Sequence, residues 1–475
     1  MPTNDRVTVI GAGPAGLTAA YELARHGISG TIVEATDSIG GLSQTAQRDG
    51  YRFDLGGHRF FTKAPEVDAL WDEMLGEPML VRQRMSRIYY DGKFYDYPLR
   101  ATNALRNLGI VRATQCVTSY LAARAHPIAN PHNYQEWVVN QFGQVLFETF
   151  FKAYTEKVWG VPCTQISADW AAQRIKGLNL KQAISQSLFG KGKTVVTSLI
   201  DRFRYPALGP GQLWEKCAAT LQQRGWELLL NHRVVGVELD QRVRKITVED
   251  PQGNRRDLPT AHLFSSMALR DLVAAMHCPV PAEVAHAAST LTYRDFLTVA
   301  LVLDAAELFP DNWIYIHSPQ VKMGRIQNFK NWSPRMVPDP ATTCLGLEYF
   351  VNQGDATWNT SDRDLIEQGY RELQTVGLSR GQRIKGFVLR VPMAYPTYGL
   401  DYAAQVGSIR QWLEKIPNLA CIGRNGQHRY NNQDHSMVTA LIAARNLALG
   451  ENRNPWSVNQ DAQYHEGFAD APSQP

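Results

Sequence analysis

The sequence is poor in cysteine, and the cysteines that it has follow no recognisable spacing. Six are scattered over 475 residues, at positions 116, 163, 217, 278, 344 and 421, and no two form a C-x-x-C pair. This pattern argues against the usual zinc sites and against the disulfide frameworks of secreted domains, and it suits a reducing compartment. We therefore expect no metal site and a cytoplasmic location.

Long apolar runs and a strong charge of one sign are also lacking. The chain carries 49 Lys and Arg against 45 Asp and Glu, a formal net charge of +4 with the charges dispersed. No apolar stretch is long enough to span a bilayer, and the first residues, MPTNDR, contain no apolar signal core. These absences predict no membrane span and give no basis for nucleic-acid binding, while a homo-oligomer stays open.

The most informative stretch lies near the N-terminus, where a glycine-rich turn joins a β-branched run to a helical pattern. Val7 to Ile10 predicts a buried parallel strand, and apolar residues recur at helical spacing from Leu17 to Leu23. Between them stands G-x-G-x-x-G, whose glycines permit a tight turn, close approach to a pyrophosphate and close helix–strand packing. The stretch therefore predicts a dinucleotide-binding turn.

Two further features follow the second predicted strand, Thr31 to Val33. Glu34 closes that strand, where a carboxylate can accept hydrogen bonds from ribose hydroxyls. A second glycine pair, in the run Gly40-Gly41-Leu42, resembles flavoproteins of the amine-oxidase type, in which the chain passes close to bound FAD. A short strand then ends in the turn Gly56-Gly57-His58, with His58 at its tip.

The remaining pattern predicts an α/β protein with a Rossmann-type FAD-binding domain, a helical insertion and an antiparallel-sheet substrate domain. Helical spacing dominates residues 98–204, and β-type runs with interleaved aromatic residues dominate 271–384. The FAD-binding domain is expected to be discontinuous, formed by residues 1–97, 205–270 and 385–455, with a weakly ordered tail at 456–475. In its later parts, Val234 is expected to touch the adenine and residues 423–437 to approach the flavin.

Several separated segments resemble the UDP-galactopyranose mutases, whose eukaryotic type is similar in its closing run. The segment Ala153-Tyr154-Thr155-Glu156-Lys157-Val158-Trp159 is similar to the Y-T-x-K-x-W segment of that family. The resemblance extends from Val7 to about Leu447. It includes Gly56-Gly57-His58, Tyr97-Pro98, Tyr395-Pro396-Thr397, the stretch from Arg325 to Pro334, and the closing run from Gly423 to Met437.

The resemblance implies an FAD-dependent isomerase that interconverts the pyranose and furanose forms of a nucleotide sugar, UDP-galactose or a related one. In that family the reduced flavin attacks the anomeric carbon through N5, so NAD(P)H or another external reductant is implied. A leaving diphosphate needs cations from the protein, and Arg174 and Arg325 match the family's phosphate-binding arginines. The residues alone leave open that each arginine is a surface ion-pair partner.

The resemblance also implies roles for other residues. His58 would lie beside the flavin as a third catalytic residue, and Arg424 would lie near the reduced ring. The residues expected to contact substrate are Tyr97, Tyr154, Trp159, Tyr315, Tyr395 and Tyr430, each of which core packing would also explain. The residues expected to bind FAD are Gly11, Gly13, Ala15, Gly16, Glu34, Gly40, Gly41, Leu42, Gly57, His58, Val234, Gly423, Arg424, Gln433, Asp434, Ser436 and Met437, the last four through backbone N–H groups.

Two other classes of function share the first motif. A flavin oxidase of the amine-oxidase or protoporphyrinogen-oxidase type is the main alternative. Against it, Leu42 stands where amine oxidases usually place an arginine, and Arg174 and Arg325 would be unexplained. A non-catalytic flavin- or nucleotide-binding protein would bind FAD tightly without turnover.

Overall fold

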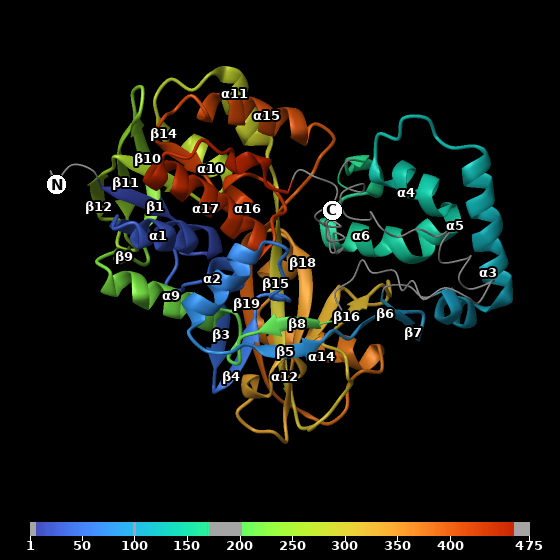
Figure 1. The fold of residues 1–475 in the computed structure, drawn as a ribbon. Helices are drawn as coiled ribbons and strands as arrows, with labels where there is room; N and C mark the ends of the chain where they lie inside the picture. The colour runs from blue at the N-terminus through green and yellow to red at the C-terminus, as the bar shows by residue number, and fades with distance from the viewer. Residues whose placement is uncertain (1–5, 98–100, 169, 171–201, 460–475) are drawn as a thin grey trace, which may run out of the picture.

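In the computed structural model the described residues are 6–97, 101–168, 170 and 202–459. Within them the chain forms a dinucleotide-type α/β part, a helical insertion and a large, mostly antiparallel sheet (Figure 1). The helical insertion projects to one side of the molecule, and the large sheet lies below the α/β part. The predicted α/β class is confirmed.

A five-stranded parallel sheet carries the N-terminal motif. Its strand order is β20 (Leu419–Cys421), β13 (His262–Ser265), β1 (Val7–Ile10), β2 (Gly30–Val33) and β9 (Glu227–Leu229). One face is covered by α1 (Pro14–Arg25), α2 (Pro65–Leu75), α9 (Gly211–Gln223) and α17 (Gln433–Leu449). Because alternate residues of β1 point to opposite faces, Val7 and Val9 join this core and Ile10 joins the core on the other side.

The other face of the parallel sheet packs against a second, four-stranded sheet. Its order is β12 (Arg255–Pro259), β11 (Val243–Glu249), β10 (Arg233–Leu239) and β14 (Met276–His277). The same apolar core includes residues of α10 (Leu269–Ala274), α11 (Ala282–Thr290) and α15 (Tyr402–Leu413). The parallel sheet is therefore buried on both sides, as parallel sheets usually are.

The seven-stranded sheet has one feature that the predicted domain boundaries miss. Its order is β19 (Arg383–Pro396), β15 (Tyr293–Leu303), β18 (Thr343–Val351), β17 (Arg325–Asn328), β16 (Trp313–Ile316), β6 (Ser86–Tyr90) and β7 (Lys93–Asp96). The outer strands β6, β7 and β19 lie mostly or wholly outside the range 271–384. The sheet recruits them through pairing of β16 with β6 and of β15 with β19, which no local pattern specifies.

A helix covers one face of this sheet. It is α14 (Asp362–Thr375), and the Ser361 hydroxyl accepts a hydrogen bond from the Asp364 amide, which makes Ser361 the N-cap. Shorter elements complete the region: α12 (Phe329–Trp332), α13 (Ala356–Asn359) and the two-stranded pairs β3 (Thr45–Arg48) with β4 (Tyr51–Asp54) and β5 (Leu80–Gln83) with β8 (Arg202–Tyr205).

The helical insertion is more broken than its sequence pattern suggests. It contains α3 (Ala101–Ala125), α4 (Tyr134–Phe142), α5 (Gln144–Leu146) and α6 (Ala153–Trp159). Gly109 interrupts α3 with φ 77°, and a π-helical turn at Phe147–Lys152 precedes α6. Residues 98–100, 169 and 171–201 of the predicted insertion lie outside the described residues.

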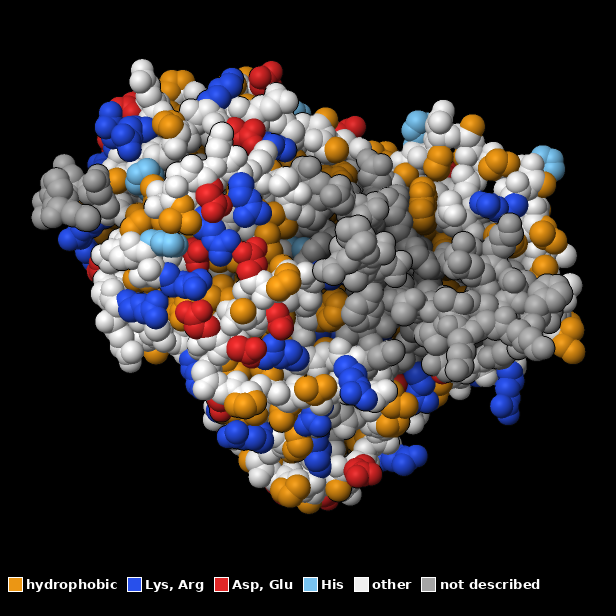
Figure 2. All heavy atoms as spheres, in the orientation of Figure 1, with side chains coloured by type: hydrophobic (Ala, Val, Ile, Leu, Met, Phe, Trp, Pro, Cys, Tyr) orange, Lys and Arg blue, Asp and Glu red, His pale blue; other side chains and the backbone are white. Residues whose placement is uncertain are grey.

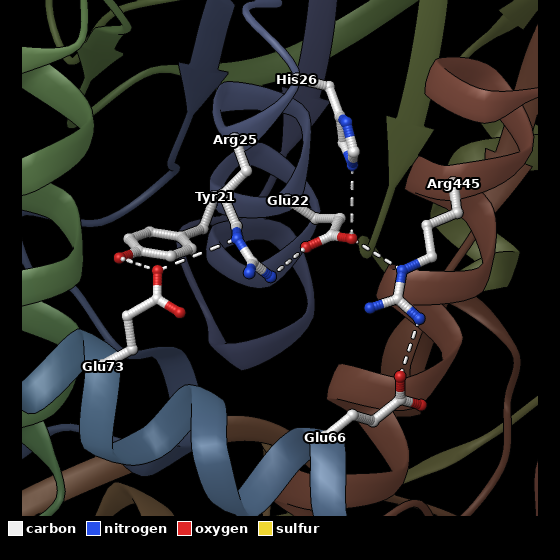
Figure 3. Close-up of polar contacts among 7 residues, drawn as sticks. All are labelled: Tyr21, Glu22, Arg25, His26, Glu66, Glu73 and Arg445. Atoms are coloured by element: carbon white, nitrogen blue, oxygen red, sulfur yellow. Dashed lines mark hydrogen bonds and ion pairs between the residues drawn. The ribbon is translucent and has the colours of Figure 1, made fainter.

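A buried charge network ties three helices of the α/β part together (Figure 3). Glu22 of α1 has a side chain only 3% exposed, and it accepts from Arg445 of α17 at 2.7 Å. Arg445 also contacts Glu66 of α2 at 2.7 Å, while Arg25 and His26 approach Glu22 from its own helix. The network holds α1 and α17 side by side, so that the first turns of both helices lie at the same end of the sheet.

The surface and the cysteines agree with the composition. Figure 2 shows acidic and basic side chains interspersed over the visible face of the α/β part. All six cysteines are free, and five of them are buried. No helix in the described part of the chain is long and apolar enough to cross a membrane.

Candidate active site

The glycine turn after β1 leaves no room for side chains. Gly11 has φ +98°, and a Cβ there would lie 2.2 Å from the Ser266 Oγ. A Cβ on Gly16 would lie 1.9 Å from the Gly11 carbonyl oxygen, so helix and turn touch as the motif predicts. The first-turn amides of α1, which include those of Ala15 and Gly16, have no partner within the helix and can receive an anion.

Glu34 braces this turn. One carboxylate oxygen accepts from the Ala12 amide at 2.9 Å, and the other accepts from the amide and the hydroxyl of Thr36, both at 2.9 Å. Glu34 is half-buried, and a carboxylate has about four acceptor positions, so one remains for a ribose hydroxyl. Its contact with a ribose stays a prediction.

The second glycine pair lies directly against the first turn. The Gly40 amide donates to the Ala12 carbonyl at 2.9 Å, and a Cβ on Gly13 would lie 3.7 Å from the Gly41 Cα. Leu42, the next residue, packs in an apolar cluster that includes Leu55 and Tyr395. The pair therefore connects the dinucleotide turn to the region of the large sheet.

The late glycine element closes the same end of the α/β part. A Cβ on Gly423 would lie 2.7 Å from the Ala15 Cβ, and the Gly423 amide donates to the Thr439 Oγ1 at 2.9 Å. Val234, which is 7% exposed, packs in the core on the other face of the parallel sheet with Ile10. Segments far apart in the sequence thus surround the first turn of α1.

The start of α17 differs from expectation in its backbone donors. The Ser436 amide donates to the Asn432 carbonyl at 3.0 Å, so it is used within the helix. Met437 is fully buried, and its sulfur accepts the Trp71 indole N–H at 3.0 Å. The expected backbone contact from Ser436 is therefore corrected, because only the first-turn amides of a helix are free of intrahelical acceptors.

Gln433 gives an independent indication of a ligand at this helix start. Its Oε1 accepts from the Trp214 indole at 3.3 Å, while its Nε2 is buried without a partner among the described residues. A buried amide N–H without an acceptor is unfavourable, so this atom fits a ligand oxygen. Together with the glycine cradle, it makes the site suitable for a dinucleotide such as FAD. Asp434, the next residue, is 6% exposed.

The turn after β4 presents His58. Gly56 has φ +100°, and a Cβ there would lie 3.9 Å from the His58 Nε2 and 3.8 Å from an Arg325 guanidinium nitrogen. The His58 Nε2 lies 3.0 Å from the Leu55 carbonyl oxygen. Burial, followed by the charges of Arg424 and Arg325, lowers the pKa of His58 to about 4, so His58 is neutral at pH 7. Gly57 beside it is exposed and lies against Gln327.

Arg325 is held by a buried carboxylate that the sequence did not reveal. The pairing of β17 with β18 places Arg325 opposite Glu348, and the Arg325 Nε donates to a Glu348 oxygen. Glu348 is fully buried, and its second oxygen accepts from the Gln327 Nε2 at 2.9 Å. Burial lowers the pKa of Arg325, but Glu348 and three nearby tyrosines outweigh it and raise the pKa well above its usual value.

Aromatic rings surround this arginine. Tyr154 stands edge-on to Tyr315 at 5.8 Å, and Tyr97 lies 4.9 Å from Tyr315 on another side. Tyr154 also stacks on His317 with ring centroids 4.4 Å apart. Burial raises the pKa of Tyr154 well above its usual value, so its hydroxyl stays protonated and available as a donor.

A second cation lies against two stacked rings. Tyr395 and Tyr430 stack with centroids 5.7 Å apart and planes 11° apart, and the Arg424 guanidinium carbon lies 5.5 and 4.7 Å from their respective centroids. The guanidinium also donates to the carbonyls of Asn431 and Ala394. These contacts fix Arg424 in place next to His58.

Trp159 and Arg174 are the two predicted site residues for which the structure offers the least support for a role in the site. Trp159 is 6% exposed and packs edge-on against Trp170 at 4.8 Å, within the core of the insertion. Its ring lies 6.4 Å from Tyr395, so it adjoins the site while serving as a packing residue. Arg174 lies outside the described residues.

Two cationic side chains, those of Lys157 and Arg294, connect α6 to the large sheet by hydrogen bonds to main-chain oxygens. The Lys157 ammonium donates to the carbonyls of Ile316, Ser318 and Met323 at 3.2, 2.9 and 3.1 Å. The Arg294 side chain donates to the carbonyls of Val158 and Phe350 at 3.1 and 2.6 Å. The lysine of the Y-T-x-K-x-W segment therefore has a structural task, which its place in that segment could have signalled.

Comparison with known proteins identifies the fold. Residues 9–74 match the family described as NAD(P)-binding Rossmann-like domain. A crystal structure of reduced UDP-galactopyranose mutase superposes with a TM-score of 0.83 and 22% identity, covering 98% of this chain and all of that one. The chain has the fold of UDP-galactopyranose mutase. The resemblance predicted from the sequence is thus confirmed for the fold.

Sequence similarity to curated proteins is partial. A probable UDP-galactopyranose mutase of Klebsiella pneumoniae is 26% identical over 175 residues, 35% of this chain and 44% of that protein. Protoporphyrinogen oxidase 2 of Arabidopsis thaliana is 38% identical over 69 residues, 14% of either chain. The matched part thus spans less than half of either relative.

Within the mutase fold, the described residues gather most of the predicted site. His58, Arg325, Tyr154, Tyr315 and Tyr395 converge on one region, as their contacts and electrostatic couplings show. Sequence reasoning missed Glu348, which stands in a mostly apolar strand that is buried throughout, and nothing local marks it as a partner of Arg325. The described residues contain no cluster of His, Cys, Asp or Glu that could hold a metal ion.

Proposed function

We propose that this protein is an FAD-dependent mutase that interconverts the pyranose and furanose forms of a nucleoside diphosphate sugar. The observation that carries the proposal is Arg325, whose side chain is 18% exposed and lies beside His58 and Gly56, bordered by Tyr154, Tyr315 and Tyr395. A cation held among hydroxyl groups suits an anionic leaving group. An apolar or amine substrate would give this arginine no role.

The residues that would hold FAD come from the glycine cradle. The first turn of α1 would receive the pyrophosphate, Glu34 the ribose, and the start of α17 with the Gln433 Nε2 the flavin end. When bound and reduced, FAD supplies a nucleophilic nitrogen, N5, for the anomeric carbon of the sugar. The fold's similarity to a reduced UDP-galactopyranose mutase supports this assignment.

The chain's own groups would bind and orient the substrate. Arg325, fixed by Glu348, would bind the diphosphate both before and after it leaves, and Arg174 would be its second cation. The hydroxyls of Tyr395 and Tyr430 would donate to phosphate or sugar oxygens. His58, neutral at pH 7, would act as a hydrogen-bonding group without adding charge, because its pKa is lowered to about 4.

The reaction leaves no net oxidation, and this gives the test. The purified protein, reconstituted with FAD and reduced with dithionite, is offered UDP-, dTDP- and GDP-sugars separately. We expect a furanose product over many turnovers with one of them, and no stoichiometric loss of reductant. Consumption of one reductant per product would show an oxidoreductase and refute the proposal.

The main alternative is an oxidase, a function suggested by the match of 69 residues to protoporphyrinogen oxidase 2. An oxidase would consume oxygen in proportion to substrate. Oxygen uptake measured with candidate amines and with protoporphyrinogen separates the two functions. Uptake matched to substrate at rates of the order of 1–10 s⁻¹, typical of enzymes, would replace the mutase proposal. The reductant in the cell, NAD(P)H by our proposal, is tested by anaerobic bleaching of the flavin.

A further inference from the structure

One backbone conformation in the described residues is unusual for its residue type. Seven non-glycine residues have positive φ, and six of them are Asp, Asn or His, which tolerate this region; the His is His428, with φ 45°. The seventh is Met393, with φ 51°. A methionine stays in such a conformation only where its surroundings enforce it, and such positions cluster at functional sites.

Met393 and His428 each stand two positions before a tyrosine of the candidate site. Met393 precedes Tyr395, and His428 precedes Tyr430. These are the two rings that stack on each other at 5.7 Å and lie against Arg424. The positive-φ residues therefore lie in the two segments that orient these rings.

At Met393 the strain belongs to a bulge between β15 and β19. Phe296 pairs with Val391, and Arg294 pairs with Tyr395, so four steps along β19 match two steps along β15. In a regular ladder Arg294 would face Met393. The bulge shifts the pairing by two residues, so Tyr395 lies about 7 Å along the strand from the position that a regular ladder would give it.

A buried carboxylate holds the bulge. Asp295 is 5% exposed, and its two oxygens accept from the amides of Met393 and Gln353, each at 2.6 Å. On the other side, the Asn425 Nδ2 donates to the Met393 carbonyl at 3.0 Å. Asn425 adjoins Arg424, so the same short turn fixes both the bulge and the guanidinium that faces the rings.

We propose that Met393 and Asp295 are positioning residues of the substrate site: the bulge that they form sets Tyr395 in its stack with Tyr430. In this proposal neither residue has to contact the ligand itself. The effect on the ligand rests on the proposed function, since it assumes that the stacked pair contacts the diphosphate. The effect on the stack of Tyr395 and Tyr430 does not depend on the proposed function.

The test compares two substitutions at one position. Valine is β-branched and resists φ 51°, whereas glycine accepts it. Near-UV circular dichroism of the ligand-free, FAD-reconstituted protein reports the stacked pair as the band that Tyr395→Phe removes. We expect Met393→Val to remove that band and Met393→Gly to keep it. A band that survives in Met393→Val overturns the inference whether or not any nucleotide binds.

Ligand affinity gives the second readout, with UDP as the probe on the reduced holoenzyme. We expect Met393→Val and Asp295→Asn to raise the Kd at least 10-fold, and Met393→Gly to change it less than 3-fold. In a Tyr395→Phe background, Met393→Val should add less than 2-fold, because Met393 acts on the ligand through the Tyr395 hydroxyl, which that background lacks. An undiminished effect in that background overturns the positioning role.

The control separates strain from position. Asp49 has φ 50° in the exposed turn between β3 and β4, and Asp49→Val creates the same backbone conflict there. It should lower the melting temperature as much as Met393→Val does and leave the Kd for UDP unchanged. If wild-type protein binds none of UDP, dTDP and GDP, the proposed function fails, and the dichroism band alone decides the role of the bulge.

Discussion

Replacing Asp54 by Asn should stabilise the protein above neutral pH. Asp54 ends β4, is 1% exposed, and accepts from the Thr45 hydroxyl at 2.8 Å and from the Tyr205 hydroxyl. Burial, only partly offset by these hydrogen bonds, raises the pKa of Asp54 from 3.8 to about 7. The folded protein therefore retains a proton that the unfolded chain has already lost.

The magnitude follows from that difference in pKa. A raised carboxyl pKa means that stability falls as pH rises from about 4 to about 7 and then levels off. The difference of 7 − 3.8 = 3.2 in pKa, at 1.36 kcal/mol for each unit, amounts to about 4 kcal/mol at pH 8. With an unfolding entropy of about 2.1 cal/mol/K for each of 475 residues, this corresponds to roughly 4 °C in melting temperature.

The assay is thermal unfolding of wild type and Asp54→Asn from pH 5 to pH 9. The asparagine keeps an acceptor for Thr45 and offers a donor to the Tyr205 oxygen, so it should melt several degrees above wild type at pH 8. Asp311→Asn is the control, because it removes the buried partner of Arg87 at 2.6 Å and should lower the melting temperature at pH 8. Parallel pH profiles for wild type and Asp54→Asn would refute the reasoning.

Three further outcomes are expected. Gly11→Ala would place a Cβ 2.2 Å from Ser266 and should weaken FAD binding at least 10-fold by flavin fluorescence, and an unchanged affinity would contradict the tight turn. Glu348→Gln removes the charge that pairs with buried Arg325 and should cost about 3 kcal/mol of stability. It should also lower kcat for the nucleotide sugar. If the variant has wild-type stability and wild-type kcat, the Arg325–Glu348 ion pair does not have the role described here. Burial lowers the pKa of His317 to about 3, so stability should fall as pH drops below 6.5. His317→Gln should flatten that acid limb of the melting profile, and an unchanged limb would show that other groups cause it.

Local patterns were sufficient to predict the dinucleotide part of the fold. The run Val7 to Ile10, the glycine turn and Glu34 specify strand, turn and strand end by short-range rules of period and backbone freedom. The late turn at Gly423 followed the same rules. These segments converge on one binding site because of the order of the strands in a parallel sheet, so their convergence could also be predicted.

The parts that could not be predicted depend on long-range register. Glu348 meets Arg325 only because β17 and β18 pair in one particular alignment. The pairing of β6 with β16 brings residues 86–96 into a sheet formed mostly by residues beyond 290. The bulge at Met393 depends on a buried carboxylate 98 residues away. No period or propensity in the sequence encodes such alignments.

The three carbonyls bound by Lys157 have a consequence for how the sequence of this protein could be altered. Every acceptor is a main-chain oxygen, so the hydrogen bonds of Lys157 depend on the backbone conformation of residues 316–323 and not on their side chains. The exposed residues Pro319, Gln320 and Lys322 could therefore be varied in a library while the buried residues Ser318 and Val321 are kept, and α6 would stay docked. Under the proposed function, this segment follows His317, on which Tyr154 stacks, and is therefore a place to change substrate selectivity without altering the fold.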